Sequence, residues 1–90
     1  MLNIFTGEYM NINKKEILKN ICYTELVYER INKKLNIQFS KKQIEEFILK
    51  ILKETEECFF SKKGKNYYIV NRENNVRITI NSHTFRIITA

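Results

Sequence analysis

The spacing of hydrophobic residues along the chain changes near Cys58. Before it, apolar residues recur about every 3.6 positions, which is typical of amphipathic helices, and after it they alternate with polar residues, which is typical of half-buried strands. This order predicts an α+β fold in which two to three N-terminal helices pack on one face of a C-terminal antiparallel meander of three to four strands. Ninety residues are enough for one domain, which we expect over 13–90.

The clearest expected helix begins after Ser40. Ser40 and Gln43 have the order of a capping box. Phe39 precedes the cap and Ile44 follows it at the spacing of a hydrophobic staple. One apolar face then follows at helical spacing, made of Ile44, Phe47, Ile48, Ile51 and Leu52. We therefore expect this helix to pack against the sheet.

An earlier helical stretch begins after Asn13, which can cap it with Glu16 three residues later. Its apolar residues continue at helical spacing as Ile17, Leu18, Ile21, Tyr28, Ile31 and Leu35. Thr24 can cap a second helix, so one bent helix and two separate helices both remain open. Asn36 is a plausible end. Residues 1–12 have no clear period and are expected to be an extension or a short strand formed by Leu2, Ile4 and Phe5.

The C-terminal third has the alternation expected of strands. Cys58 to Phe60 can enter a strand, and the later strands are expected at 67–71, 76–81 and 85–89. Turns are expected at 61–65, 72–75 and 81–84. Gly64 in the first turn is free to adopt a positive φ.

The net charge of +6 and the isoelectric point of about 9.4 suggest an acidic partner such as nucleic acid. A second explanation is genomic: Asn, Ile and Lys make up 37 of the 90 residues, and their codons are rich in A and T. No apolar run approaches the length of a membrane span, and the N-terminus lacks a signal-peptide pattern, so a cytoplasmic location is expected.

Few residues could carry chemistry. Cys22 and Cys58 are expected to be buried small hydrophobic residues in a reducing compartment. His83, the single histidine, lies in a predicted turn without an orienting partner. Two cysteines and one histidine at these spacings match no zinc pattern, and Asp is absent. We therefore expect no metal, no cofactor and no enzymatic activity. An enzyme using Cys22 or His83 is the third hypothesis.

A basic patch is expected on the sheet. If Ile80 pairs with Phe85, Thr79 faces Arg86 and the side chains of Arg77 and Arg86 become diagonal neighbours on the solvent face. Tyr67 and Tyr68 point to opposite faces, so one of them is in the core. The expected contacts to a nucleic acid or other partner are Arg77, Arg86, Lys63, Lys65, Arg72 and Tyr68. An ordinary solvated sheet face is the simpler alternative.

Three stretches resemble a small bacterial family known as domain of unknown function 3781: NICYTELVYERINKKL, GKNYYIVN and NVRITINSHTFRIIT. The resemblance covers about residues 13–89. It implies a stand-alone cytoplasmic protein of A/T-rich bacteria or their mobile elements, and it carries no activity or catalytic residue. The order of elements is also similar to HU proteins and winged helices, but there is no proline-tipped basic arm, and Glu45 and Glu46 would disfavour DNA at the Ser40 helix.

These observations favour a small non-catalytic protein that binds a nucleic acid or nucleoprotein partner through a basic sheet face. The alternative is a mobile-element inhibitor of a bacterial defence system, of the anti-CRISPR type, that acts by protein–protein binding. An exposed edge strand or the apolar N-terminus would suit a homodimer. No membrane association is expected.

Overall fold

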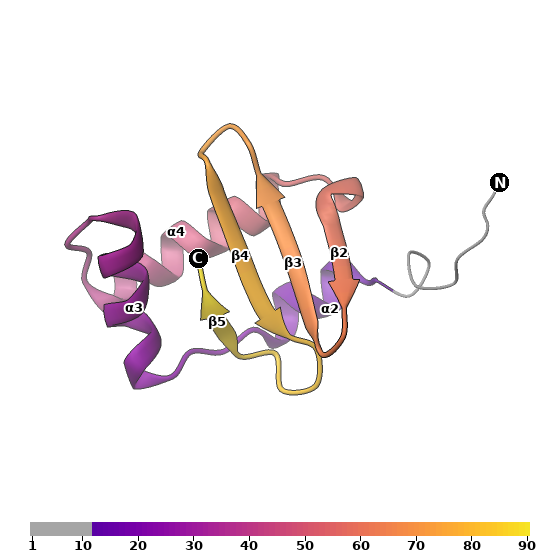
Figure 1. Cartoon of the computed structure of the whole chain (residues 1–90), viewed down its shortest axis with the longest axis horizontal. Coiled ribbons are helices and arrows are strands. Elements are labelled where there is room, and N and C mark those ends of the chain that lie inside the picture. Colours follow the sequence, from indigo (N-terminus) through magenta and orange to yellow (C-terminus); the bar gives the residue numbers. More distant parts are fainter. Residues whose placement is uncertain (1–11) are drawn as a thin grey trace, which may run out of the picture.

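The computed structural model describes residues 12–90 and confirms the expected α+β fold (Figure 1). The elements follow the order α2 (Lys14–Asn20), α3 (Glu25–Leu35), α4 (Lys41–Glu54), the 3-10 turn η1 (Glu57–Phe59), β2 (Phe60–Lys63), β3 (Asn66–Asn71), β4 (Val76–Asn81) and β5 (Ile87–Thr89). In this part of the chain the four strands form an antiparallel meander in the order β2-β3-β4-β5. The strand expected from Leu2, Ile4 and Phe5 lies outside the described residues.

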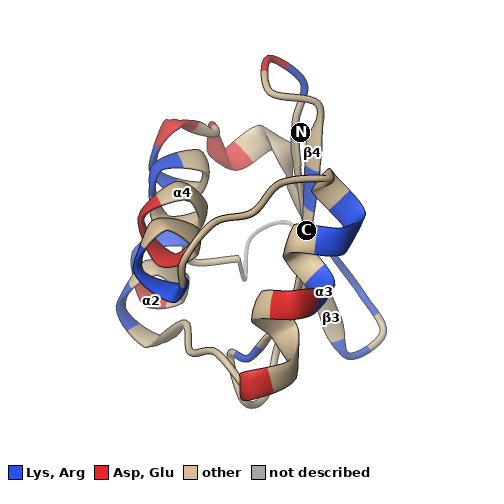
Figure 2. Cartoon of the chain, turned by 90° about the vertical axis from the view of Figure 1, so that its left-hand side faces the viewer, with Lys and Arg blue, Asp and Glu red and all other residues tan. Residues whose placement is uncertain are grey.

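The helices are placed unequally around the sheet. Helices α2 and α4 cross behind it in Figure 1, whereas α3 lies at the side next to β5. The side view in Figure 2 separates the α2 and α4 layer from the strands. The sheet therefore has one face packed on α2 and α4 and one face turned away from them.

The core lies between the sheet and these helices and is built mainly from isoleucine. The side chains that are almost fully buried are Ile17, Val27, Ile31, Ile44, Ile48, Ile51, Leu52, Ile69, Ile78, Ile80 and Ile87. β-Branched residues suit both the pleated sheet and this tight packing. Ile12 and Phe85 pack at the edge of the same core.

The helix boundaries follow local capping. Ser40 forms the predicted capping box with Gln43. Asn13 caps α2 by accepting a hydrogen bond from the Glu16 amide at 3.1 Å. The question of one helix or two is resolved as two, because Ile21 leaves the helical conformation with a ψ of 142° and α3 starts after Thr24. Asn36 ends α3 in the left-handed conformation, as expected.

The first hairpin is tighter than predicted. Residues 61–63 belong to β2, and the turn reduces to Gly64 and Lys65, with Gly64 at a φ of +62°. Two-residue hairpins need positive φ, which glycine adopts without strain. The strand expected to begin at Cys58 begins at Phe60, because Cys58 and Phe59 lie in η1.

The predicted register between β4 and β5 is wrong. Ile80 pairs with Ile87, not Phe85, and the ladder shifts between Thr79 and Ile80. Phe85 takes a φ of +60° and its amide donates to the Asn81 carbonyl at 2.8 Å, so it belongs to a longer turn. The shift of two residues still puts Ile87 on the buried face, which is why hydrophobic alternation alone could not distinguish the two registers.

The prediction that both cysteines are buried is also wrong, since Cys22 and Cys58 are exposed. Cys22 lies in the extended link between α2 and α3, not on a helical stripe, and its backbone pairs with the chain around Arg86. Cys58 lies in η1 and its side chain stays exposed, whereas Phe60, at the start of β2, is buried in the core.

Candidate functional site

The open face of the sheet carries the side chains that alternate with the buried ones. The strand registers and the alternation of side chains place the following residues on it: Ser61, Lys63, Asn66, Tyr68, Val70, Arg77, Thr79 and Asn81. We call these eight residues the open sheet face. Thr79 is on this face but is itself buried, at 8% exposure. Val70 on this face is 36% exposed, so an apolar side chain is also accessible there.

Tyr68 and Arg77 form the centre of the open sheet face. The guanidinium carbon of Arg77 lies 5.2 Å from the centre of the Tyr68 ring, which is cation–π geometry. The Asn66 side-chain amide lies 3.4 Å from the Tyr68 hydroxyl and donates to it. Tyr67 is the tyrosine that enters the core, with 7% exposure, so Tyr68 is the one available to a ligand. The structure therefore brings together two of the six predicted contact residues.

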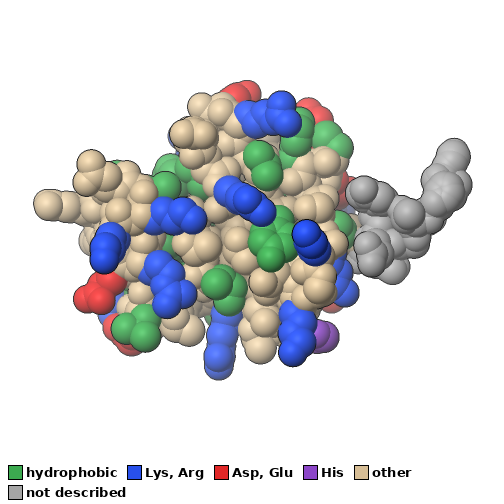
Figure 3. Space-filling model, in the orientation of Figure 1, with side chains coloured by type: hydrophobic (Ala, Val, Ile, Leu, Met, Phe, Trp, Pro, Cys, Tyr) green, Lys and Arg blue, Asp and Glu red, His purple; other side chains and the backbone are tan. Residues whose placement is uncertain are grey.

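Acidic residues are distributed very unevenly between the part of the chain before Phe60 and the part from Phe60 onward. The 31 residues from Phe60 to Ala90 contain six basic residues and one acidic residue, whereas the preceding 59 contain ten basic and nine acidic residues. None of the strands β2, β3, β4 and β5 contains an acidic residue. In Figure 3, Lys and Arg side chains spread across the sheet side of the molecule, and the acidic side chains lie at its margins. Figure 2 shows the acidic residues on the helices and connecting loops.

The other predicted contacts surround the open sheet face. Lys63 lies on it, next to the hairpin turn that carries Lys65. Arg72 is at the opposite end, with its guanidinium 5.9 Å from the centre of the Phe59 ring, and Phe59 is 42% exposed. These cations therefore lie beyond both ends of the Tyr68–Arg77 pair.

Arg86 is not a diagonal neighbour of Arg77. Its carbonyl accepts from the Asn81 amide at 2.9 Å, so it lies opposite a position four residues beyond Arg77 on β4. At about 3.3 Å per strand residue, this offset is about 13 Å. The corrected register separates the two arginines that the sequence paired, and Arg86 instead extends the basic surface toward the Cys22 segment.

Of the residues with catalytic potential, the exposed Cys22 lies beside the turn that carries His83, because its thiol donates to the Thr84 carbonyl at 3.6 Å. His83 is exposed in the 81–86 turn, where its backbone amide donates to the Asn81 side-chain oxygen at 2.8 Å. In the described part of the chain, no group of three His, Cys, Asp or Glu residues could hold a metal ion. Within residues 12–90, no helix is both long and apolar enough to cross a membrane.

The perturbed titratable groups lie away from the open sheet face, between α3 and α4. The Tyr28 hydroxyl donates to the Glu45 carboxylate at 2.6 Å, and its ring stacks on Tyr23 with centres 5.5 Å apart. Burial, followed by this hydrogen bond, raises the pKa of Tyr28 to about 12. Burial also raises the pKa of Tyr23 above its usual range, with the Glu45 charge adding to it. The exposed Lys41–Glu25 ion pair, at 2.8 Å, bridges the same two helices. This cluster ties α3 to α4.

Comparison with known proteins places the chain in a family. Residues 15–90 match the family described as Protein of unknown function (DUF3781). The chain belongs to the DUF3781 family. The resemblance inferred from the sequence is therefore confirmed over nearly the same range, and the family description transfers no activity or residue role to this member. No curated protein and no solved structure matches the chain.

Two residues near Arg77 were not predicted from the pattern. Lys34 lies in the last turn of α3 and Asn75 lies in a polar loop, and both line the same hollow as Arg77. Asn75 is two residues before Arg77 in the sequence, whereas Lys34 comes near only because the end of α3 meets the β3–β4 loop, so no local signal could have identified Lys34.

Proposed function

We propose that this DUF3781 protein is a non-catalytic cytoplasmic binding protein that holds single-stranded nucleic acid, free or within a nucleoprotein, on the open sheet face. The observation that supports this proposal is the concentration of positive charge around an accessible aromatic residue. Strands β2 to β5 present basic side chains and no acidic ones, with Tyr68 and Arg77 in contact at the centre.

The chemistry of the two central residues fits a base. Unpaired bases stack on aromatic rings and on arginine guanidinium planes. Such stacking is worth about 1–3 kcal/mol per base. Tyr68 and Arg77 offer both surfaces within one contact of 5.2 Å. Asn66 and Asn81 are register partners in the β3–β4 ladder. The Asn81 side-chain oxygen is used within the turn, so Asn81 offers its side-chain nitrogen as a donor, and Asn66 offers its side-chain oxygen as an acceptor.

The surrounding cations fit a phosphate backbone. Lys63 and Lys65 lie near the β2–β3 hairpin and Arg72 lies at the other end of β3. A strand that crosses the open sheet face between these ends would pass over Tyr68 and Arg77. A single strand fits better than a duplex, because reading a duplex groove requires a projecting helix or ribbon, whereas the open sheet face is a broad surface.

Binding of a fluorescein-labelled 12-nucleotide strand, measured by fluorescence anisotropy over a series of salt concentrations, tests the proposal. DNA and RNA strands of mixed sequence are compared in separate titrations. Each phosphate contact on a single strand contributes about −0.7 to the slope of log affinity against log salt. Three to five contacts therefore predict a slope of about −2 to −3.5.

Arg77→Glu and Lys50→Glu form a matched pair, because both change the net charge equally. Lys50 is exposed on α4, in the layer behind the sheet. We expect Arg77→Glu to weaken binding more than tenfold, about 1.4 kcal/mol, and to make the salt slope shallower, and Lys50→Glu to change affinity less than threefold. Salt-insensitive binding, absent binding, or equal losses in both variants would refute the proposal. The defence-inhibitor alternative stays a prediction, which co-purification of a host nuclease would test.

A further inference from the structure

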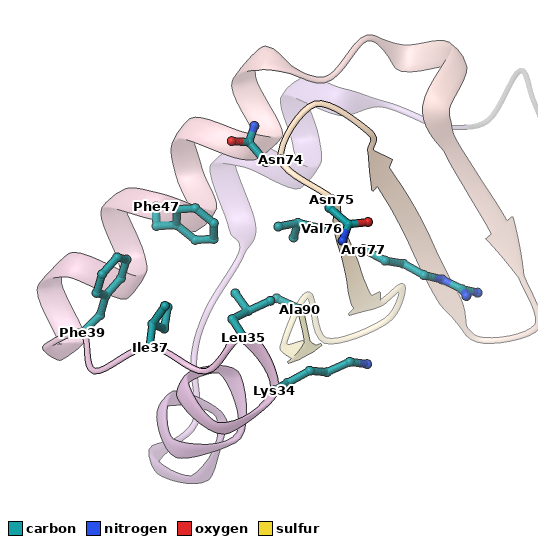
Figure 4. Close-up of a pocket in the computed structure, with 10 residues that line it drawn as sticks. All are labelled: Lys34, Leu35, Ile37, Phe39, Phe47, Asn74, Asn75, Val76, Arg77 and Ala90. Carbon is teal, nitrogen blue, oxygen red and sulfur yellow. The ribbon is translucent and has the colours of Figure 1, made fainter.

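A hollow of about 630 Å³ opens beside Arg77. It lies between the C-terminal end of α3, the 36–39 link, α4 and the β3–β4 loop (Figure 4). The residues around it are Lys34, Leu35, Ile37, Phe39, Phe47, Asn74, Asn75, Val76, Arg77 and Ala90. Its volume is within the range of about 300–1,000 Å³ that is typical of small-ligand sites.

The hollow combines an apolar wall with two positively charged side chains, Lys34 and Arg77. Phe39 and Phe47 meet edge to face with ring centres 6.0 Å apart. In Figure 4, Lys34 and Arg77 start across the hollow from the two rings, and their charged ends point away from the rings. The Arg77 guanidinium reaches the Tyr68 ring on the open sheet face. There is no Asp or Glu among the lining residues. An occupant with a flat apolar body and a negative charge at one end therefore fits the lining.

Two asparagines add hydrogen-bonding capacity. One side-chain N–H of Asn74 donates to the Asn71 side-chain oxygen at 3.0 Å, which leaves the second N–H and the side-chain oxygen of Asn74 for a ligand. Asn75 adds a second amide to the lining, at a backbone φ of +54°. Amide side chains can pair with the polar edge of a base, since each carries a donor and an acceptor.

The wall that carries Phe39 is held in place by α3. The Asn32 side chain accepts from the Phe39 amide at 3.0 Å and donates to the Phe39 carbonyl at 3.0 Å. These two hydrogen bonds between the Asn32 side chain and the Phe39 backbone fix the position of the 36–39 link before any ligand binds. Preorganisation of this kind lowers the entropy cost of binding.

We propose that this hollow takes one nucleotide of the bound strand, with the base against Phe47 and the asparagine amides and the phosphate between Lys34 and Arg77. The inference rests on the proposed function, because Arg77 belongs both to the hollow and to the open sheet face. It also has a consequence of its own: the base at one position of the strand contributes more to the binding affinity than the other bases, and the protein selects the base at that position.

Two measurements on the whole chain test this site. The first titrates each of the four ribonucleoside 5′-monophosphates into labelled protein and follows amide chemical shifts. The second measures affinities of a strand series in which one base at a time is removed and the backbone kept. We expect shifts confined to the lining residues, and one base-free position that binds about tenfold more weakly than the others, as loss of a stacked base predicts.

Lys34→Gln and Lys33→Gln are a matched pair of exposed neighbours on α3, and only Lys34 lines this hollow. Lys34→Gln is expected to weaken monophosphate binding about fivefold and Lys33→Gln less than twofold, because a phosphate contact to lysine is lost in only one of them. Equal effects of the two variants would overturn the inference.

The outcomes separate the inference from the proposed function. In one outcome, strand binding depends on salt, every base-free strand binds with equal affinity, and no amide shifts change at the hollow. That outcome overturns the inference and leaves the proposed binding at the open sheet face standing. Monophosphate binding without strand binding makes the hollow a free-nucleotide site and overturns both the strand-bound nucleotide and the proposed function. Absence of both kinds of binding overturns both statements.

Discussion

Asn71 connects three parts of the fold through a buried side chain, and replacing it by leucine tests that connection. Its side-chain nitrogen donates to the Thr55 hydroxyl at 2.9 Å, and that hydroxyl donates to the Ile51 carbonyl at 2.7 Å. Its side-chain oxygen accepts from the backbone and side-chain nitrogens of Asn74 at 2.9 and 3.0 Å. The end of α4, the end of β3 and the β3–β4 loop therefore meet at one residue that is 7% exposed.

The expected cost follows from these three bonds. A hydrogen bond contributes about 1 kcal/mol net, and a buried group left without its partner costs about 1–3 kcal/mol. The Asn74 groups lie nearer the surface and can turn to water, and a leucine adds apolar contact. We therefore expect Asn71→Leu to lower the free energy of unfolding by about 2 kcal/mol. For a domain of this size, that loss lowers Tm by about 8–16 °C.

Thermal and urea unfolding followed by circular dichroism at 222 nm measure this change. Asn20→Leu is the control, because Asn20 is exposed and its side chain makes one local bond to Glu16. The control is expected to stay within about 0.5 kcal/mol of the parent protein. A double-mutant cycle with Thr55→Val isolates the pair and is expected to give a coupling of about 1 kcal/mol. An Asn71→Leu protein as stable as the control would refute the reasoning.

Three further predictions concern single local features. Ser40→Ala removes the side-chain oxygen that accepts a hydrogen bond from the Gln43 backbone amide at 3.2 Å. We expect this variant to lower the free energy of unfolding, measured in urea, by about 1 kcal/mol, and Ser40→Asp to keep most of the stability. Gly64→Ala is expected to lower the free energy of unfolding by about 1–2 kcal/mol, because a residue with a side chain disfavours the φ of +62°. Nothing lies within 4 Å of the new methyl group, so the backbone conformation alone causes this loss. Gly64→Asn is expected to lose less stability. The pKa of Tyr28, raised to about 12, predicts a loss of stability from pH 10 to pH 12, since the unfolded chain releases this proton first. Tyr28→Phe is expected to remove that part of the alkaline loss.

Each of these predictions has a contrary result. An unchanged Ser40→Ala midpoint would mean that tertiary packing alone fixes the start of α4. Equal costs for Ala and Asn at position 64 would mean that the turn, not the left-handed φ, limits substitution. A constant difference in stability between the parent protein and Tyr28→Phe from pH 8 to pH 12 would contradict the folded-state pKa.

Much of the fold followed from local sequence because local rules fix it. The capping box at Ser40 sets the start of α4 without help from the rest of the chain. The alternation from Val76 to Ile80 fixes which face of β4 is buried. The register between β4 and β5 did not follow, because it depends on the length of the turn that includes Phe85, and a shift of two residues leaves the hydrophobic alternation unchanged.

The sequence also predicted the candidate site only in part, because alternation shows which side chains share a face and does not show which of them meet. The alternation in β3 and β4 puts Tyr68 and Arg77 on the same face, whereas the register of the β3–β4 ladder brings them together. Arg86 was misplaced together with its strand. Lys34 could not be identified because its proximity to Arg77 depends on how α3 docks beside the sheet. The exposure of Cys22 likewise depends on a link between helices whose periodicity imitates a helix.

The structure also bears on whether the basic charge is a by-product of A/T-rich codons. Codon bias acts on the whole chain, so it would add lysine to the helices and the sheet alike and would not separate the signs. Secondary structure does not explain the separation either, because strands disfavour glutamate and lysine together. From Phe60 to Ala90, however, acidic residues fall to one while six basic residues remain, and three of the four arginines of the chain are among them. A selective loss of one sign on one layer of the fold is what a polyanionic ligand on that layer would require, and this argument favours the open sheet face over a compositional origin of the charge.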